Sequence, residues 1–507
     1  MTRGTPVQPR LDLERDRIVE RVINAEVLRR AFLKCSPSPV WTGASTHGTF
    51  GGTFEWTPLF RALVSRELDS PGNFDEFRAV VARLSVYTGM VHHDLDEVTA
   101  GVLSGLVAKI DAAIKNPLLG QEELSELIAA AGILPMFGFP TRERPLYGGK
   151  PRDDLDETVV TARSLDQAIT MFAPGARVIR DKQDHFPVGF AHFIRWKGKI
   201  IGRDPMGARL GLARCRDCAV VLAVDITGDS GTDDGGSWPA NICPGCGVPM
   251  EEFNAYQPKG FRTTFSGSDY DPGIDAYVAP AATSLGHVPT GAMSSVVGAL
   301  TVEMLPGKQL VTTNDNRGRF FSGRAAGSDG AVVVVDDELY VPRVAAYTSK
   351  VDGNNVHPPH PFAIVDVLTT DVIVLTPRNV ALNGGILPTG LKVLPAGMPA
   401  MTSFVQMLVR GCKDYLQIDE SELKIGLQPF RDSGRVSQRI FIGDALENGS
   451  GYVRLIGDGQ TLKSILDDVV NVTGARLADP VRHPGCDSSC PSCLRSYENR
   501  QVHHMLN

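Results

Sequence analysis

The sequence lacks an export signal, a membrane-spanning segment and a net positive charge. The N-terminus carries no apolar leader, and no run approaches the roughly 18 apolar residues that a membrane-spanning helix needs. Lysine and arginine number 51 against 58 acidic residues, which gives a net charge of −7. This balance excludes a strongly basic nucleic-acid coat protein, although it leaves room for a local basic groove. We therefore expect a cytoplasmic protein, with no membrane partner, whose thiols stay reduced.

The sequence also lacks a recognisable catalytic motif. A phosphate-binding GxxxxGK[ST] loop needs Ser or Thr after its lysine, but none of the Gly-Lys pairs at 149–150, 198–199 and 307–308 has one. No phospholipase-type nuclease motif and no carboxylate cluster with nuclease spacing is present, and Cys35 has no evident base. We expect no catalytic residue. A nucleic-acid-processing hydrolase with an unrecognised site is the alternative from another functional class.

Length and residue patterning predict a multi-domain α+β protein. A chain of 507 residues exceeds what one hydrophobic core usually serves. Apolar residues recur at helical spacing up to about residue 132, whereas short β-branched runs between Gly and Pro turns follow. The expected domains are a helical docking region (1–132), a β-rich middle region (133–280) and a C-terminal domain (281–507). Helices are predicted at 11–34, 74–90, 96–116, 121–131, 403–417 and 461–472, and strands at 332–335, 363–367 and 372–375.

Four of the nine cysteines form two CxxC motifs. Cys215 and Cys218 are separated from Cys243 and Cys246 by a 24-residue spacer that begins with a strand-like segment. Each CxxC aims two thiolates at one point, and two such knuckles complete a tetrahedral zinc site. The middle region is therefore predicted to hold a structural zinc ribbon, with no coordination position left for water.

Three further cysteines, Cys486, Cys490 and Cys493, lie close together near the C-terminus. Their x3 and x2 spacing predicts a second metal site, and the Pro- and Ser-rich knuckle favours zinc over an iron–sulfur cluster. Spacing alone leaves the fourth ligand open. His483 is nearest in sequence, and His503, His504 and Cys412 compete with it. The expected cofactor content is about two zinc ions per chain, and Cys35 and Cys412 are otherwise unassigned.

The segment 485–499, GCDSSCPSCLRSYEN, resembles the signature of the MZB domain, a zinc-binding domain found C-terminal to certain superfamily 2 DNA helicases. Segments 134–142, 172–175, 370–372, 403–423 and 440–452 resemble other parts of these helicases in the same order, so the resemblance covers roughly residues 130–507. One departure concerns the metal ligands. Relatives often carry a cysteine two residues before Cys486, where this chain has Pro484, and His483 is the candidate substitute.

The resemblance to a helicase's C-terminal half, without its motor, implies a non-catalytic accessory subunit. The chain is similar to the DrmB-type subunit of the DISARM phage-defence system, which works beside a separate helicase. The implied partner is thus a superfamily 2 DNA helicase or translocase in trans, with DNA in the complex. The zinc knuckles would present a docking surface to the motor subunit. A split helicase, whose motor is a neighbouring gene product, is a further alternative.

Several residues are candidates for nucleic-acid or partner contact. The loop 444–452 contains Gly449 and Gly451, which would let a phosphate approach backbone amides, although a tight strand-to-helix turn is the simpler interpretation. A local basic face could form around the first resemblance segment, although a solvated surface is the simpler interpretation; its residues are Arg142, Arg144, Arg177, Arg180 and Lys182. The candidate contacts are Arg142, Arg144, Asp444, Gly449, Gly451, Tyr452, Arg495, Tyr497 and Asn499.

Overall fold

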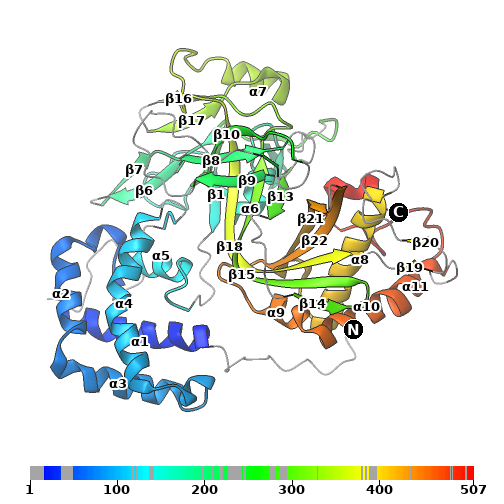
Figure 1. The fold of residues 1–507 in the computed structure, drawn as a ribbon. Helices are drawn as coiled ribbons and strands as arrows, with labels where there is room; N and C mark the ends of the chain where they lie inside the picture. The colour runs from blue at the N-terminus through cyan, green and yellow to red at the C-terminus, as the bar shows by residue number, and fades with distance from the viewer. Residues whose placement is uncertain are drawn as a thin grey trace.

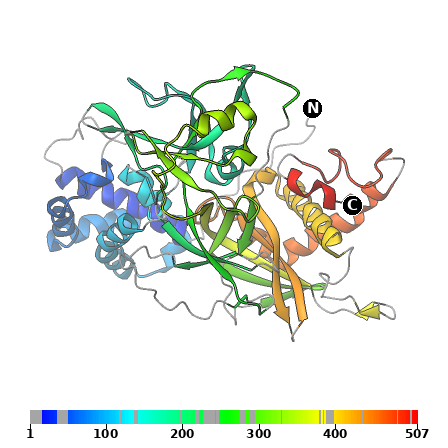
Figure 2. The ribbon, with the colours of Figure 1, turned by 90° about the horizontal axis from the view of Figure 1, so that it is seen from above.

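The protein's structure is a computed structural model. It describes residues 16–506 except for 36–49, 117–118, 122, 136–141, 197, 208, 216–220, 226–241, 244–246, 275–280, 286–293, 328, 378–380, 383–384, 387–396, 433–434, 480, 482 and 497–498. The N-terminal helices and the C-terminal helices lie on opposite sides of the molecule, with the β-sheets between them (Figure 1 and Figure 2).

The N-terminal region is helical, as its residue spacing predicts, and it encloses its own hydrophobic core. Phe32 of the first helix stacks on Trp56 with ring centroids 5.8 Å apart. The helix that starts at Leu95 is capped by Asp94, whose side chain accepts hydrogen bonds from the N–H groups of Asp96 and Glu97. The elements are α1 (Asp16–Cys35), η2 (Thr53–Glu55), α2 (Pro58–Leu68), α3 (Pro71–Ser85), η3 (Gly89–His92), α4 (Leu95–Lys115) and α5 (Leu124–Ala130).

The middle of the chain builds a six-stranded sheet with two small accessory sheets. Its strand order is β16 (Gly323–Ala326), β17 (Ala331–Val334), β5 (Pro187–Phe190), β11 (Phe261–Thr263), β1 (Glu143–Tyr147), β2 (Val159–Ser164). Around it lie α6 (Leu165–Met171), η4 (Asp337–Leu339), α7 (Pro342–Thr348), the sheet β12 (Ser268–Asp269), β4 (Gln183–His185), β3 (Val178–Arg180), and the hairpin β6 (His192–Trp196), β7 (Lys199–Arg203).

A nine-stranded sheet connects the middle of the chain to the C-terminal region. Two long antiparallel strands, β15 (Leu300–Asn314) and β18 (Phe362–Pro377), run through it and reach from the upper part of the molecule to the C-terminal helices (Figure 1). The other strands are β13 (Ala282–Leu285), β14 (Ser294–Val297), β10 (Glu251–Tyr256), β8 (Arg209–Arg214), β9 (Val221–Asp225), β21 (Leu423–Asp432) and β22 (Arg435–Asp444).

Helices of the C-terminal region cover one face of this sheet. Side chains of β18 and β22, such as Ile373 and Ile442, share a core with Leu408 of α8 and Ile456 of α9. The remaining elements of the region are α8 (Gly397–Leu416), η6 (Glu420–Glu422), α9 (Tyr452–Gly457), α10 (Gly459–Asp468), η7 (Val469–Gly474), α11 (Ala475–Ala478), η8 (Arg500–Met505) and the hairpin β19 (Ala381–Leu382), β20 (Gly385–Ile386).

The structure corrects the two strands predicted between residues 363 and 375 and bears on the domain boundary predicted at residue 280. The strands predicted at 363–367 and 372–375 are a single strand, β18, because its residues from Ile364 to Pro377, except Asp371, pair with β15. The nine-stranded sheet takes strands from both sides of residue 280, so the boundary placed there does not separate two sheets. Among the described residues, no helix combines the length and hydropathy that crossing a membrane requires.

Candidate metal centre

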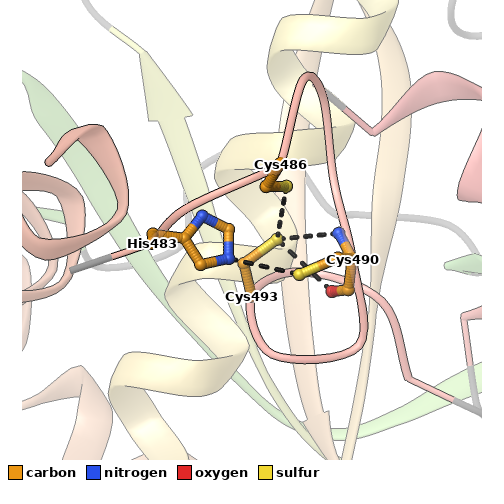
Figure 3. A group of neighbouring side chains, drawn as sticks. All are labelled: His483, Cys486, Cys490 and Cys493. Atoms are coloured by element: carbon orange, nitrogen blue, oxygen red, sulfur yellow. Dashed lines mark hydrogen bonds between the residues drawn. The ribbon is translucent and has the colours of Figure 1, made fainter. Parts of the chain in front are cut away.

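The side chains of His483, Cys486, Cys490 and Cys493 converge on one point (Figure 3). Their potential ligand atoms all lie within 4.8 Å of one another. The Nε2 atom of His483 is 3.2 Å from the Sγ atom of Cys490, and the Sγ atoms of Cys486 and Cys493 are 3.9 Å apart. Zinc–sulfur bonds of about 2.3 Å at tetrahedral angles place two sulfur atoms about 3.8 Å apart. The four side chains thus fit one tetrahedral zinc ion.

A tight turn between Cys490 and Cys493 produces this convergence. The backbone N–H of Cys493 donates to the carbonyl of Cys490 at 3.0 Å, and the N–H of Cys490 donates to the Sγ atom of Cys493 at 3.0 Å. The N–H of Arg495 donates to the same carbonyl at 3.1 Å. N–H groups directed at sulfur favour the thiolate, which is the form that binds metal.

The thiols of the cluster differ in acidity. Desolvation opposes ionisation of Cys490, but the N–H of Ser492 and the His483 ring outweigh it and lower the pKa of Cys490 to about 6. Desolvation and the neighbouring thiols raise the pKa of Cys486 to about 11. Cys490 therefore ionises more readily than Cys486, and a bound divalent cation would stabilise the Cys486 thiolate.

The structure selects His483 among the candidate fourth ligands. The Nε2 atom of His503 instead lies 3.0 Å from the carbonyl oxygen of Ser496 and 2.9 Å from Oδ1 of Asn499. Cys412 is fully buried in the core beneath α8, where desolvation raises its pKa to about 12. His504 lies outside the described cluster. A neutral imidazole nitrogen and three thiolates form an ordinary structural zinc set.

Helix α8 holds the metal-binding segment in place. The guanidinium of Arg410 donates to the carbonyl of Cys493, and Met407 packs against Cys493, Leu494 and Leu506. The sequence offered no signal for this role of Arg410. Asn499 and Arg495, two of the predicted nucleic-acid or partner contacts, form hydrogen bonds within the protein. Asn499 Nδ2 donates to Gln406 at 2.8 Å, and Arg495 Nε donates to Ser489 at 2.9 Å. Tyr497 lies outside the described residues.

The structure describes half of the predicted zinc ribbon. Cys215 and Cys243 are both buried and share a small cluster with Ala213 and Met250, whereas Cys218 and Cys246 lie outside the described residues. The N–H of Gly247, whose φ is +75°, donates to the carbonyl of Cys243 at 2.8 Å. Cys215 and Cys243, the first cysteine of each CxxC motif, therefore lie in the same buried cluster.

The loop 444–452 forms an internally hydrogen-bonded turn around Asp444, in keeping with the simpler of its two sequence interpretations. The buried carboxylate of Asp444 accepts hydrogen bonds from the N–H groups of Gly451 at 2.8 Å and Val453 at 3.0 Å. A Cβ atom on Gly449, where φ is +81°, would lie 3.1 Å from Asp444 Oδ2. The glycines therefore allow the chain to wrap Asp444, whose carboxylate already occupies the position of an anion. Tyr452 begins helix α9 directly after the loop.

We expect Asp444→Asn to destabilise the protein by about 1.5–3 kcal/mol. The amide nitrogen would face one of these two N–H donors, so that a charge-assisted hydrogen bond is lost. Urea denaturation followed by circular dichroism measures the change. The matched control is Asp458→Asn, because Asp458 is an exposed cap of α10 and Asn caps helices about as well as Asp. Equal effects of the two substitutions would contradict this role of Asp444.

The arginines of the predicted basic face are mostly ion-paired. Arg142 pairs with Asp366 and Glu447, which are nearly buried. Arg177 pairs with the fully buried Asp184 at 2.7 Å, and its guanidinium lies 5.0 Å from the ring centroid of Tyr270. Paired guanidinium groups hold the fold together and present little free charge to nucleic acid. Arg144 is the exception, since none of the described carboxylates pairs with it.

Comparison with known families assigns the C-terminal region. Residues 404–494 match the family model of MZB, the MrfA Zn-binding domain. The match contains the four zinc-ligand candidates and the Asp444 loop, together with most of α8, β21, β22, α9, α10 and α11. The match lies within the C-terminal domain that the sequence predicts at 281–507.

Similarity between this chain and known proteins over longer stretches is weaker than the MZB match. No curated protein matches the chain. Two solved structures that match are crystal structures of the DUF1998 helicase MrfA, one bound to DNA and one bound to DNA and AMPPNP, each with 10% identity. The first covers 77% of this chain with a TM-score of 0.28, and the second covers 79% with a TM-score of 0.23. These scores do not establish a shared fold. The chain spans 40% of the length of either helicase.

Proposed function

We propose that this protein is a non-catalytic, zinc-binding accessory subunit that pairs with a separate DNA helicase or translocase in bacterial anti-phage defence. The observation that carries the proposal is the MZB domain, with its His483/Cys486/Cys490/Cys493 zinc set. The lack of a GxxxxGK[ST] motif in the sequence supports a role beside a motor. The resemblance to DISARM subunits supports the defence setting.

In this role the MZB domain would act as a rigid docking element. Four protein ligands leave a zinc ion no open position for water, so its contribution is to fix the fold of the terminus. The predicted ribbon would bind a second zinc ion through Cys215, Cys218, Cys243 and Cys246, and would rigidify the edge of the nine-stranded sheet at β8 and β9. DNA would be bound mainly through the partner, in keeping with the acidic net charge of this chain.

Co-purification from the native host tests the proposal. A tagged full-length chain is expected to bring down a superfamily 2 helicase, and the repurified chain alone is expected to show no ATP or nucleic-acid hydrolysis above background. Cys490→Ser should reduce helicase recovery, whereas Cys35→Ser, at a half-buried thiol of the helical region, should not. Hydrolysis that persists in the repurified chain would favour the enzyme alternative, and recovery without any helicase would contradict the pairing.

A further inference from the structure

A small cavity lies at the junction between the helical region and the sheets. Its volume is about 150 Å³. The ends of α4 and α5 line it on one side, and β1, the turn after β10, β18 and the Asp444 loop line it on the other. The polar residues that line it are Asn116, Gln121, Arg142, Arg144, Gln257, Thr369, Glu447 and Asn448.

Arg144 contributes a positive charge that no described carboxylate neutralises. Its Nε donates to the carbonyl of Pro258 at 2.7 Å and its Nη1 to the carbonyl of Glu143 at 3.0 Å, while its Nη2 donates to no described acceptor. Desolvation, and then the charge of Arg142, lower the pKa of Arg144 to about 10. Arg144 is half-buried, so water screens its charge only in part, and this guanidinium favours an anion beside it.

Gln257 adds an unused donor to the same cavity. The residue is 9% exposed, and its Nε2 group is buried without a hydrogen-bond partner among the described residues. Buried amide groups are almost always hydrogen-bonded. A ligand with acceptor oxygen atoms in the cavity would satisfy both Gln257 Nε2 and Arg144 Nη2.

The surroundings of Arg144 are positive. Lys259 has no ion pair among the described residues. Its side chain lies next to Gly120, beside the cavity wall: its Cε atom is 3.6 Å from the point that a Cβ atom would occupy if Gly120 were substituted. Burial and the charges of Lys259, Arg144 and Arg203 lower the pKa of His192 to about 3. Glu447, the one acid among the described wall residues, is ion-paired with Arg142 and accepts a hydrogen bond from the N–H of Thr369 at 3.1 Å.

We propose that this cavity binds a small oxyanion of the phosphate class, held by Arg144 and Gln257. A guanidinium fork suits the oxygen atoms of phosphate, and the amide N–H adds a neutral donor. The cavity accommodates inorganic phosphate or a terminal phosphate group, whereas a duplex backbone needs an open surface. Because the site joins the helical region to the sheets, the bound anion would strengthen their contact. This inference is independent of the proposed pairing with a helicase.

Phosphate titration of the isolated full-length chain tests the site. The melting temperature is expected to rise with inorganic phosphate, and not with chloride at equal ionic strength, because a ligand of the folded state stabilises it. Isothermal titration calorimetry gives the affinity. Short oligonucleotides with and without a 5′-phosphate separate a terminal nucleic-acid phosphate from the free ion. A wild-type chain that does not respond to phosphate in either form would overturn the proposal.

Two variants localise the binding. Arg144→Gln is expected to weaken phosphate affinity at least tenfold, whereas Arg66→Gln removes an exposed charge from the distant helix α2 and should leave affinity unchanged. Gln257→Glu supplies an internal anion, so that variant should fold without phosphate and no longer respond to it. If Arg144→Gln fails to fold, Gln257→Glu decides the question. A wild-type phosphate response in Gln257→Glu, or in folded Arg144→Gln, would contradict the proposal.

Discussion

Replacing Cys490 by serine is expected to remove one zinc ion and unfold the C-terminal segment. The wild-type chain should contain about two zinc ions, and the variant about one. Few apolar side chains hold this segment, since Cys493, Leu494 and Leu506 are the buried members of its cluster. The metal must therefore supply most of the local stability, on the order of 10 kcal/mol. Elemental analysis measures the zinc, and limited proteolysis near residues 480–506 measures the unfolding.

Three further variants make the zinc prediction specific. His483→Ala should behave like Cys490→Ser, whereas His503→Ala should retain both ions, because the His503 ring contacts Ser496 and Asn499 instead. Cys35→Ser should have no effect on zinc content. One zinc ion in the wild-type chain would contradict either the ribbon or the C-terminal centre. Loss of that ion in Cys490→Ser would assign it to the C-terminal centre.

Replacing Arg142 by methionine is expected to destabilise the protein by about 3–5 kcal/mol. The substitution leaves Asp366 and Glu447, whose side chains are 5% and 9% exposed, without their shared counter-ion, and isolated buried carboxylates carry a large desolvation cost. Burial already raises the pKa of Glu447 despite Arg142. Urea denaturation monitored by tryptophan fluorescence measures the effect.

An exposed ion pair provides the control for Arg142. Arg319 and Glu338 also form an ion pair, with side chains 43% and 79% exposed, and Arg319→Met should cost less than about 1 kcal/mol. Adding Glu447→Gln to Arg142→Met should recover part of the lost stability, since one of the two unpaired charges is removed. If Arg142→Met costs no more than Arg319→Met, Arg142 is not a structural counter-ion and its nucleic-acid role regains support.

Local patterns in the sequence predicted the helices and the C-terminal metal cluster well. The helical spacing of apolar residues located α1, α3, α4 and α8, because one turn of helix repeats within a few residues. The spacing of Cys486, Cys490 and Cys493 also predicted the zinc centre, because ligands within a few residues of one another in a tight turn are necessarily close in space. The merging of two predicted strands into β18 could not be foreseen, because it depends on pairing with β15 some 60 residues earlier in the chain.

The sequence by itself determined which residue types could bind zinc and that no recognisable motor motif accompanies them. Only the tertiary structure decided how polar residues at a distance from one another are used. It places His483 rather than His503 beside the three cysteines, makes Asp444 the acceptor of its own loop amides, and pairs Arg142, whereas no described carboxylate pairs with Arg144. The physical reason is that a ligand set or a counter-ion is defined by distances of a few ångströms, which segments far apart in sequence acquire only when the sheets and helices pack.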